Sequence, residues 1–295
     1  MNKDIYSFYN SICTSEKCKS INKNLESLYR EWHKNVDEKF KDNIYEQKKN
    51  KKNNEKKEFI IENYSPPIYL FCSDAYLKCK NKIMIIAKEA HDSDKFGING
   101  FNELYLKDSW GSVNYINKII NNKTKQSLFL KTRKLISNIR MDQMYEEDDL
   151  KNKLCSVLIN NVNKTSPLGQ SVNCKITKPL FNEFTFNNEK EKNNIFWHEI
   201  NLLKPKKIIL LIGNDYKYQI KAAFKNMNND LDKVFTNNII SMSDGIKKLT
   251  KKIDERFIVN NHKFEILWTF HPNARFNSEQ RKYYEQTLND FTRDC

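Results

Sequence analysis

Lys207-Ile208-Ile209-Leu210-Leu211-Ile212, which runs directly into Gly213-Asn214-Asp215, is the clearest structural signal in this chain. A continuous apolar run of this length is typical of a strand buried on both faces of a parallel sheet. Three further runs share this character, and a polar residue follows each of them directly or one residue later. They are residues 83–87 before Glu89, 156–159 before Asn160 and 264–270 before His271.

Helical spacing separates these apolar runs and predicts the fold class. It occurs near residues 110–121, 128–139, 189–203, 216–226 and 277–292. Strands that alternate with helices predict an α/β fold with a central, mostly parallel sheet flanked by helices. In open α/β sheets the ligand site lies beyond the carboxyl ends of the strands. We therefore expect Glu89, Asn160 and His271 to meet at one edge of the sheet.

The first 60 residues differ from the rest of the chain. Residues 1–46 show helical spacing with apolar side chains on one face, and residues 47–58 are a basic, solvated run. We predict that residues 1–60 form a helical N-terminal extension with a basic linker, and that residues 61–295 form one α/β domain. The helices of the extension pack either against this domain or against a protein partner.

The charge of the chain favours a polyanionic partner. It has 51 Lys and Arg against 37 Asp and Glu, which gives a net charge of +14. Double- or single-stranded DNA suits this charge better than an anionic membrane surface. An AT-rich genome would also enrich Lys and Asn without selection for DNA binding. No apolar run reaches the length of a membrane-spanning helix, and the N-terminus lacks a signal-peptide pattern.

The cysteines indicate an intracellular, reducing compartment, and we expect a cytoplasmic protein. Seven cysteines are an odd number at irregular spacing, which fits free thiols. Cys13 with Cys18 and Cys72 with Cys79 are the two closest pairs. Their gaps of four and six residues match the ligand spacing of zinc sites poorly, so we expect no metal.

Four segments carry a family resemblance. They are IIAKEAH (85–91), VLINNVNKTSP (157–167), LKPKKIILLIGND (203–215) and TFHPNARF (269–276). In this order and strand context they resemble the uracil-DNA glycosylase superfamily over about residues 80–292. The resemblance implies a three-layer α/β sandwich like that of the glycosylases. It also implies a monofunctional DNA glycosylase that uses no cofactor.

The resemblance assigns the chemistry to two residues. Glu89 stands at the position of the catalytic Asp, where a carboxylate stabilises the oxocarbenium-like sugar and orients or deprotonates water. His271 would donate a hydrogen bond to the departing base. From the residues alone, Glu89 also suits a helix start and His271 a strand-end cap. His91 or Asp92 would act instead of Glu89 if the alignment is shifted.

Other residues would bind the flipped base. Asn160 would form hydrogen bonds with a pyrimidine edge through its amide. If the strand register were shifted by one residue, Asn161 would point to that side of the sheet in its place. Phe96 or Phe101 would stack on the base, although aromatic residues at this spacing also suit a core. His91 stands where uracil-specific relatives have an aromatic residue that blocks groups on C5 of the pyrimidine.

DNA contacts are expected from two loops. Lys164, Thr165 and Ser166 would clamp phosphates after the Asn160 strand. In the family, the loop after the His-Pro motif fills the gap that the flipped nucleotide leaves. Here that loop holds Asn273 in place of Ser, and Arg275 or Phe276 would be the wedge.

The departures from the family pattern bear on the substrate. Ala87 and Ala90 replace the Gly and Pro of the first loop, and the blocking aromatic residue is absent. We therefore expect a flipped uracil or a C5-modified pyrimidine as the substrate, in DNA repair or in defence against phages and viruses with modified genomes. The alternatives are a catalytically inactive glycosylase-like protein that binds DNA or a protein, and a small-molecule α/β enzyme.

Overall fold

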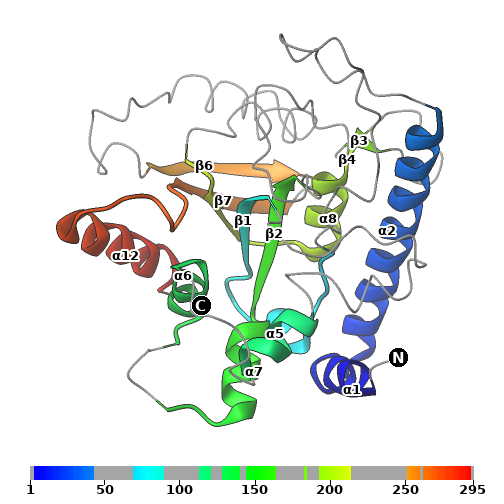
Figure 1. Cartoon of the computed structure of the whole chain (residues 1–295), viewed down its shortest axis with the longest axis horizontal. Coiled ribbons are helices and arrows are strands. Elements are labelled where there is room, and N and C mark those ends of the chain that lie inside the picture. Colours follow the sequence, from blue (N-terminus) through cyan, green and yellow to red (C-terminus); the bar gives the residue numbers. More distant parts are fainter. Residues whose placement is uncertain are drawn as a thin grey trace, which may run out of the picture.

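A central five-stranded sheet organises the molecule (Figure 1). The computed structural model describes residues 3–42, 69–89, 113–120, 128–139, 144–163, 183–184, 193–213, 251–259 and 262–293. The strands lie in the order β2 (Val157–Asn163), β1 (Ile83–Glu89), β5 (Lys207–Leu211), β7 (His262–Thr269) and β6 (Lys251–Val259). The first four are parallel, and β6 is antiparallel to β7. The predicted α/β class with a mostly parallel sheet is confirmed.

The helices also agree in outline with the sequence. Their bounds are α1 (Lys3–Ile12), α2 (Glu16–Asp42), α3 (Asp74–Lys78), α5 (Val113–Ile120), α6 (Leu128–Ile136), α7 (Glu147–Cys155), α8 (Ile195–Leu203) and α12 (Ser278–Thr292). The acidic stretch near residue 147 is the start of α7, and the helix expected at 216–226 lies outside the described residues. The edge strand β6 was not predicted. Two-residue strands β3 (Glu183–Phe184) and β4 (Asn193–Asn194) form a separate antiparallel pair.

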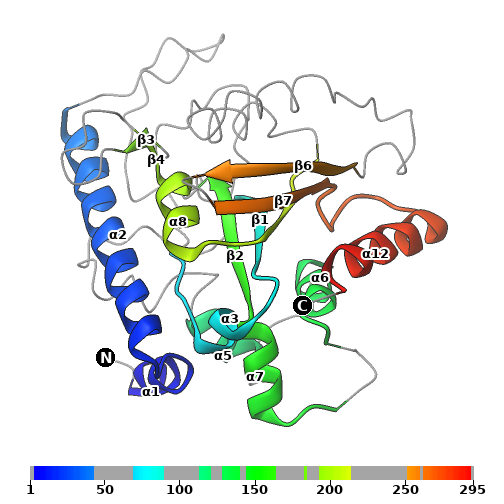
Figure 2. The same ribbon diagram turned by 180° about the vertical axis from the view of Figure 1, so that it is seen from behind.

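Alternate residues of the strands face two different cores. One core joins positions such as Met84, Leu158 and Leu210 to α2 and α8. The other joins Ile85 and Ile159 to α6 and α12. This alternation is the period-two geometry of a strand, so one register assigns every strand residue to a face. Figures 1 and 2 show α8 and α2 on one side of the sheet, with α6 and α12 on the other.

The long helix α2 belongs to the core of the α/β domain. Its residues Leu25, Leu28 and Tyr29 are fully buried, and Trp32 is 1% exposed. All four lie in the core that includes the sheet and α8. The apolar stripe seen in the sequence therefore packs against the domain, and these side chains are not presented to a partner.

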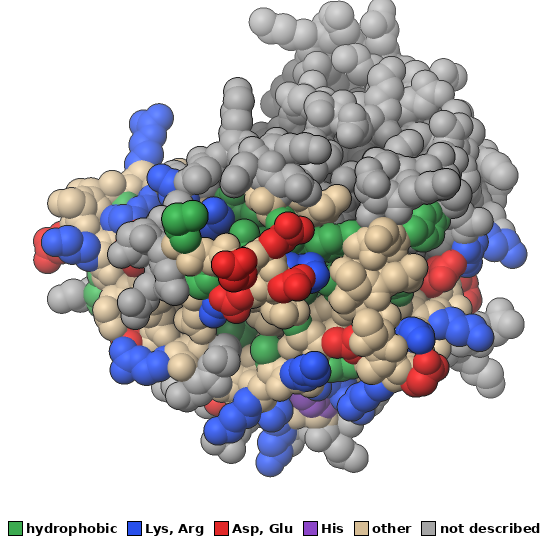
Figure 3. Space-filling model, turned by 90° about the horizontal axis from the view of Figure 1, so that it is seen from below, with side chains coloured by type: hydrophobic (Ala, Val, Ile, Leu, Met, Phe, Trp, Pro, Cys, Tyr) green, Lys and Arg blue, Asp and Glu red, His purple; other side chains and the backbone are tan. Residues whose placement is uncertain are grey.

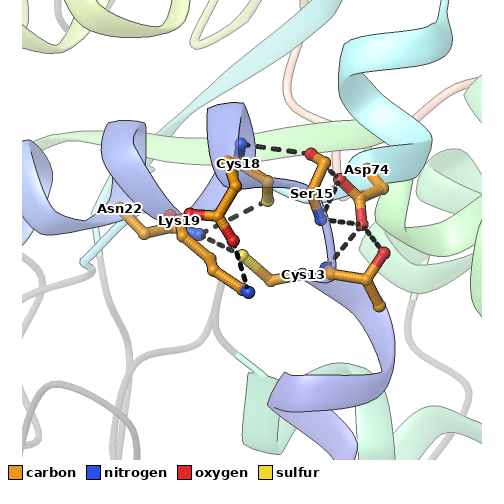
Figure 4. A network of polar contacts seen from close by, with 8 residues as sticks. Cys13, Ser15, Cys18, Lys19, Asn22 and Asp74 are labelled. Atoms are coloured by element: carbon orange, nitrogen blue, oxygen red, sulfur yellow. Dashed lines mark hydrogen bonds and ion pairs between the residues drawn. The ribbon is translucent and has the colours of Figure 1, made fainter.

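A polar cluster holds the junction of α1 and α2 against α3 (Figure 4). The Asp74 carboxylate accepts hydrogen bonds from the backbone N–H and hydroxyl groups of Thr14 and Ser15. The partial burial of Asp74 opposes its ionisation. The hydrogen bonds from Ser15 and Thr14 outweigh this effect and lower the pKa of the carboxyl group to about 2.

Beside this cluster, the structure brings distant cysteines together. Asn22 donates to Cys13 Sγ at 3.2 Å and to the Cys72 carbonyl at 2.8 Å, while its own carbonyl accepts from Cys72 N. Cys18 Sγ donates to the same Cys72 carbonyl. Burial raises the pKa of the Cys13 thiol to about 11, which keeps it a neutral, inert thiol. The five cysteines of the described part are free thiols.

Within the described ranges, no group of three or more His, Cys, Asp or Glu side chains is arranged to hold a metal ion. No helix among the described residues is both long and apolar enough to cross a bilayer.

We predict that Asp74→Asn lowers the free energy of unfolding at neutral pH by about 1 kcal/mol, because four donors lose a charged acceptor. The pKa of Asp74 is lowered in the folded state. Its contribution is therefore fully present above pH ~4, the unfolded value, and is lost as the pH falls towards 2. Urea unfolding at pH 7 and between pH 4 and 2 measures both effects. Asp149→Asn, at an exposed position on α7, is the control. Equal curves for the two variants would refute the role of Asp74.

Candidate active site

Glu89 and His271 lie at the same edge of the sheet. Ile86, Leu210 and Trp268 form one row across β1, β5 and β7. Glu89 and His271 each lie three residues beyond that row, towards the carboxyl ends of the parallel strands. Since β5 alone separates β1 from β7, the two backbones are about 10 Å apart. The two backbone positions therefore lie at the same edge of the sheet.

Gly213 occupies the end of β5 between these two positions. Its φ of +60° favours glycine, and a Cβ at this position would lie 3.8 Å from the Phe270 ring. The neighbouring strand β7 holds it in place. Gly213 N donates to the Thr269 carbonyl at 3.0 Å, and its carbonyl accepts from Trp268 Nε1 at 2.8 Å. Backbone contacts to β7 therefore fix the position of Gly213 between the two candidate catalytic positions.

The hydrogen bond to His271 selects its tautomer. His271 Nδ1 accepts from the backbone N–H of Asn273 at 3.2 Å. A neutral imidazole that accepts at Nδ1 carries its proton on Nε2, so Nε2 is a donor. The turn is closed by a hydrogen bond from Ala274 N to the His271 carbonyl at 2.9 Å. This geometry matches the donor role expected of His271.

Asn160 does not lie at the edge with Glu89 and His271. It shares a row with Ile86, three residues inside the row of Glu89, and it is fully buried. Its Nδ2 donates to Glu199 Oε2 at 2.8 Å, and its Oδ1 accepts from Asn161 N at 2.8 Å. The expectation that this amide reads a base conflicts with these contacts, because both of its ends already have partners within the chain.

Glu199 is the centre of a fully buried hydrogen-bond network that links four segments. Its Oε1 accepts from the hydroxyl of Tyr29 on α2, and Oε2 accepts from Asn160 on β2. The Tyr29 hydroxyl in turn accepts from Leu70 N at 2.9 Å. Tyr29, Glu199 and Asn160 are all 0% exposed. We call these three side chains, with Leu70 N, the Glu199 network.

Neither Tyr29 nor Glu199 is among the site residues predicted from the sequence. Tyr29 follows Leu28 on the predicted apolar face of α2, but its hydroxyl had no assigned partner. Glu199 lies in the helix predicted near 189–203, with no role predicted for its carboxyl group. A signal was present in the sequence: α8 is apolar nearly throughout, and a lone carboxylate in such a helix requires a buried partner.

The candidate DNA-contacting residues in the loop after His271 differ in burial: one is packed and two are exposed. Phe276 is packed, with its ring centroid 5.6 Å from Phe270 and 5.1 Å from Tyr284, and Arg281 lies 4.5 Å above it. This ring therefore stabilises the start of α12, and the expectation that it acts as a DNA wedge is at odds with its packing. Asn273 and Arg275 are exposed.

The remaining predicted site residues lie outside the described residues. They are His91, Phe96, Phe101, Lys164, Thr165 and Ser166. For Glu89 itself, the strand position is described and the side chain is not. The roles assigned to these side chains stay predictions.

The face opposite the candidate site carries mixed charge. Seen from below, on the side of α1 and α7, acidic side chains gather near the middle of the face and Lys and Arg are scattered around them (Figure 3). The first turn of α7 has Glu147, Asp148 and Asp149. This face therefore offers a polyanion no continuous basic surface.

We predict that Tyr29→Phe lowers the free energy of unfolding by about 1–3 kcal/mol, because Glu199 loses a donor and Leu70 N loses its acceptor in the core. Chemical unfolding of the full chain measures this loss. Tyr6→Phe is the control, since the Tyr6 hydroxyl makes no hydrogen bond with the described residues and its ring is half-buried. A loss no larger than that of the control would contradict the importance of the network.

Comparisons with known proteins add no assignment. No family model matches the chain, and a search of curated proteins returned no significant match.

Proposed function

We propose that this chain is a monofunctional DNA glycosylase, a divergent member of the uracil-DNA glycosylase superfamily with a three-layer sandwich and N-terminal helices. The observation that carries the proposal is the placement of Glu89 and His271. They come from remote segments, yet their backbone positions lie at one carboxyl edge, on the two strands that flank β5. This is where α/β sheets bind their ligands.

The proposed reaction is hydrolysis of the N-glycosidic bond of a flipped nucleotide. The bond between the base and C1′ of the sugar breaks, and its electrons leave with the base. Water forms the new bond to C1′, so the products are the free base and an abasic site. Glu89 would stabilise the positive charge on the sugar and accept a proton from the attacking water.

His271 would act on the departing base. Charge develops on a base oxygen as the bond breaks, and a fixed donor stabilises that charge most when it needs no reorientation. The hydrogen bond from Asn273 N to Nδ1 supports this role, because it leaves the proton on Nε2. Asn273 thus contributes through its backbone.

DNA is the proposed partner, and the exposed Arg275 is the candidate contact that the described loop supports. The net charge of +14 favours a polyanion. The proposed base is a uracil or a C5-modified pyrimidine, in repair or in defence against modified viral DNA. A base-by-base assay separates these substrates.

A second candidate function has one observation in its favour. Asn160, the amide that the family resemblance assigns to base recognition, is held in the Glu199 network. A glycosylase-like protein that binds DNA or a protein without catalysis would tolerate this arrangement. The activity assay distinguishes it from the enzyme.

The proposal predicts that the protein converts one of a set of duplexes to alkali-labile DNA. The set carries uracil, cytosine, thymine and C5-substituted cytosine or uracil at one position. Glu89→Gln should lower the rate on the preferred duplex by about 10²–10⁴-fold. His271→Ala should lower it by about 10²–10³-fold, since one donor to the leaving group is lost.

The control is Glu147→Gln, an exposed acid on α7 at the far face, which should keep the full rate. Strand cleavage after alkali, read on a denaturing gel, is the measurement. Absence of cleavage on every duplex, or full activity of Glu89→Gln, would overturn the enzymatic proposal. Binding without cleavage would favour the second candidate.

We also predict that Arg275 contributes to DNA binding and Phe276 to stability. Arg275→Ala should weaken duplex binding and reduce the slope of log affinity against log salt by about one, as expected for one lost phosphate contact. Phe276→Ala should instead lower the melting temperature, because its ring packs on Phe270 and Tyr284. Fluorescence anisotropy at several salt concentrations and thermal unfolding measure the two effects. The reverse pattern would show that Phe276 is the wedge.

A further inference from the structure

A pocket lies at the edge of the sheet opposite to Glu89 and His271. Its lining includes Ile83 and Val157, which are the first residues of β1 and β2. Ile83 and Glu89 are six positions apart on β1, which corresponds to about 20 Å along the strand. The pocket has a volume of about 470 Å³, within the range of small-molecule sites. It is therefore separate from the candidate active site.

The ends of four helices surround this pocket. The helices are α1, α3, α6 and α7, and residues in their last turns or directly after them line the pocket: Ile12, Lys78, Ser137 and Lys153. Figures 1 and 2 show α1 and α7 at the end of the molecule where β2 begins. Part of the lining is aliphatic, from Ile12, Ala75, Ile83, Ile136 and Val157. A ligand would therefore meet an apolar surface as well as polar groups.

The acceptor groups beside the pocket already have donors within the chain. At the end of α7, the carbonyl groups of residues 153–155 accept hydrogen bonds from Ser156, Arg133 and Ser73. The oxygens of Asp74, the acidic residue of the lining, accept from four donor groups at the junction of α1 and α2. Neither set of acceptors needs a lysine side chain as a further partner. The ammonium groups of the pocket are therefore not required to complete the fold.

Two cationic side chains and one hydroxyl group of the lining remain without an ionic or hydrogen-bond partner among the described residues. Lys78 and Lys153 form no ion pair with a described residue. The Lys153 ammonium lies 5.6 Å from the centre of the Tyr145 ring, which limits its movement. Ser137 is 4% exposed, and its hydroxyl has no hydrogen-bond partner in the described part of the chain. A buried hydroxyl of this kind is explained by a partner that the chain itself does not supply.

The charged side chains around the pocket are mostly positive. Besides Lys78 and Lys153, the guanidinium group of Arg133 is buried at the end of α7, where it donates to the Leu154 carbonyl at 3.1 Å. Asp74 supplies the opposing negative charge. A helix end carries about half a negative charge, which is less than the charge of a lysine in its last turn. These side chains therefore favour an anionic ligand.

We propose that this pocket binds a small organic anion, in which a phosphate or carboxylate group is attached to a compact apolar body. The anionic group contacts Lys78 and Lys153, and the apolar body covers Ile83 and Val157. The surrounding face carries mixed charge, so it suits a small anion and not a polyanion (Figure 3). This site goes beyond the proposed glycosylase function and does not depend on it.

The test is isothermal titration calorimetry of the full chain with four probes: uridine 5′-monophosphate, uridine, hexanoate and inorganic phosphate. We expect the monophosphate or hexanoate to bind, and the one that binds more tightly identifies the anionic group. Uridine and inorganic phosphate should bind at least about 10-fold more weakly than the preferred probe, because each lacks one half of the ligand. The preferred probe should also raise the melting temperature, since it binds the folded state.

Two variants locate the binding site. Lys78→Met and Lys153→Met keep an aliphatic side chain of similar length and remove only the charge. Each should weaken the binding of the preferred probe about 10-fold, as expected for one lost hydrogen bond between charged groups. Lys131→Met is the matched control, because Lys131 is exposed on α6 and does not line the pocket. The melting temperature of each variant without a probe shows whether its fold is intact.

Several results would overturn the inference. They are no binding of either the monophosphate or hexanoate, wild-type affinity in both lysine variants, and equal affinity for uridine. Equal affinity for inorganic phosphate would show an adventitious ion only. Uridine monophosphate also resembles a fragment of a nucleic acid, so Glu89→Gln is titrated as well. Unchanged affinity in that variant supports the pocket, whereas a loss there and not in the lysine variants assigns binding to the candidate active site. None of these results changes the outcome of the cleavage assay, which tests the proposed function separately.

Discussion

The buried carboxyl group of Glu199 is the constraint on which the arrangement of this molecule depends. A carboxyl group with no exposed surface must find donors inside the chain, since leaving it unpaired costs more than most single contacts contribute. It finds one on α2 and one on β2. The same requirement therefore docks the N-terminal helix on the domain and sets the facing of β2. The predicted domain boundary at residue 60 would therefore separate groups that the Glu199 network joins.

The position of the candidate site follows from the face on which each β2 side chain lies and from the parallel order of the strands. Four strands that point the same way bring their carboxyl ends to one edge, however far apart they are in sequence. Because the side-chain period of a strand is two, the register that places Asn160 against α8 directs Asn161 to the other face. The register thus places two chemically identical neighbours on opposite faces of the sheet.

Much of the fold is predictable here because its strands are buried on both faces. Runs such as 83–87 and 208–212 have no polar residue, which is typical of a central parallel strand. The edge strand β6 was not predicted because Lys251, Asp254 and Arg256 interrupt its apolar pattern. Charged residues are common in an edge strand, which pairs with another strand on one side only. For the site, the pattern located Glu89 and His271 at the edge. It did not distinguish Asn160 from Asn161, because facing depends on Glu199, a contact between residues 39 positions apart.

Phe276 is a second residue whose role is not predictable from local sequence. An aromatic residue directly after an exposed loop residue, here Arg275, fits a DNA wedge as well as a helix anchor, and local sequence does not separate the two. The structure decides for the anchor, since Asn277 caps α12 through a reciprocal bond with Gln280 and the preceding ring packs beneath Arg281. An anchored ring gives the loop a fixed exit from His271. Such rigidity is what a hydrogen-bond donor to a leaving group requires, because the donor then needs no reorganisation during the reaction.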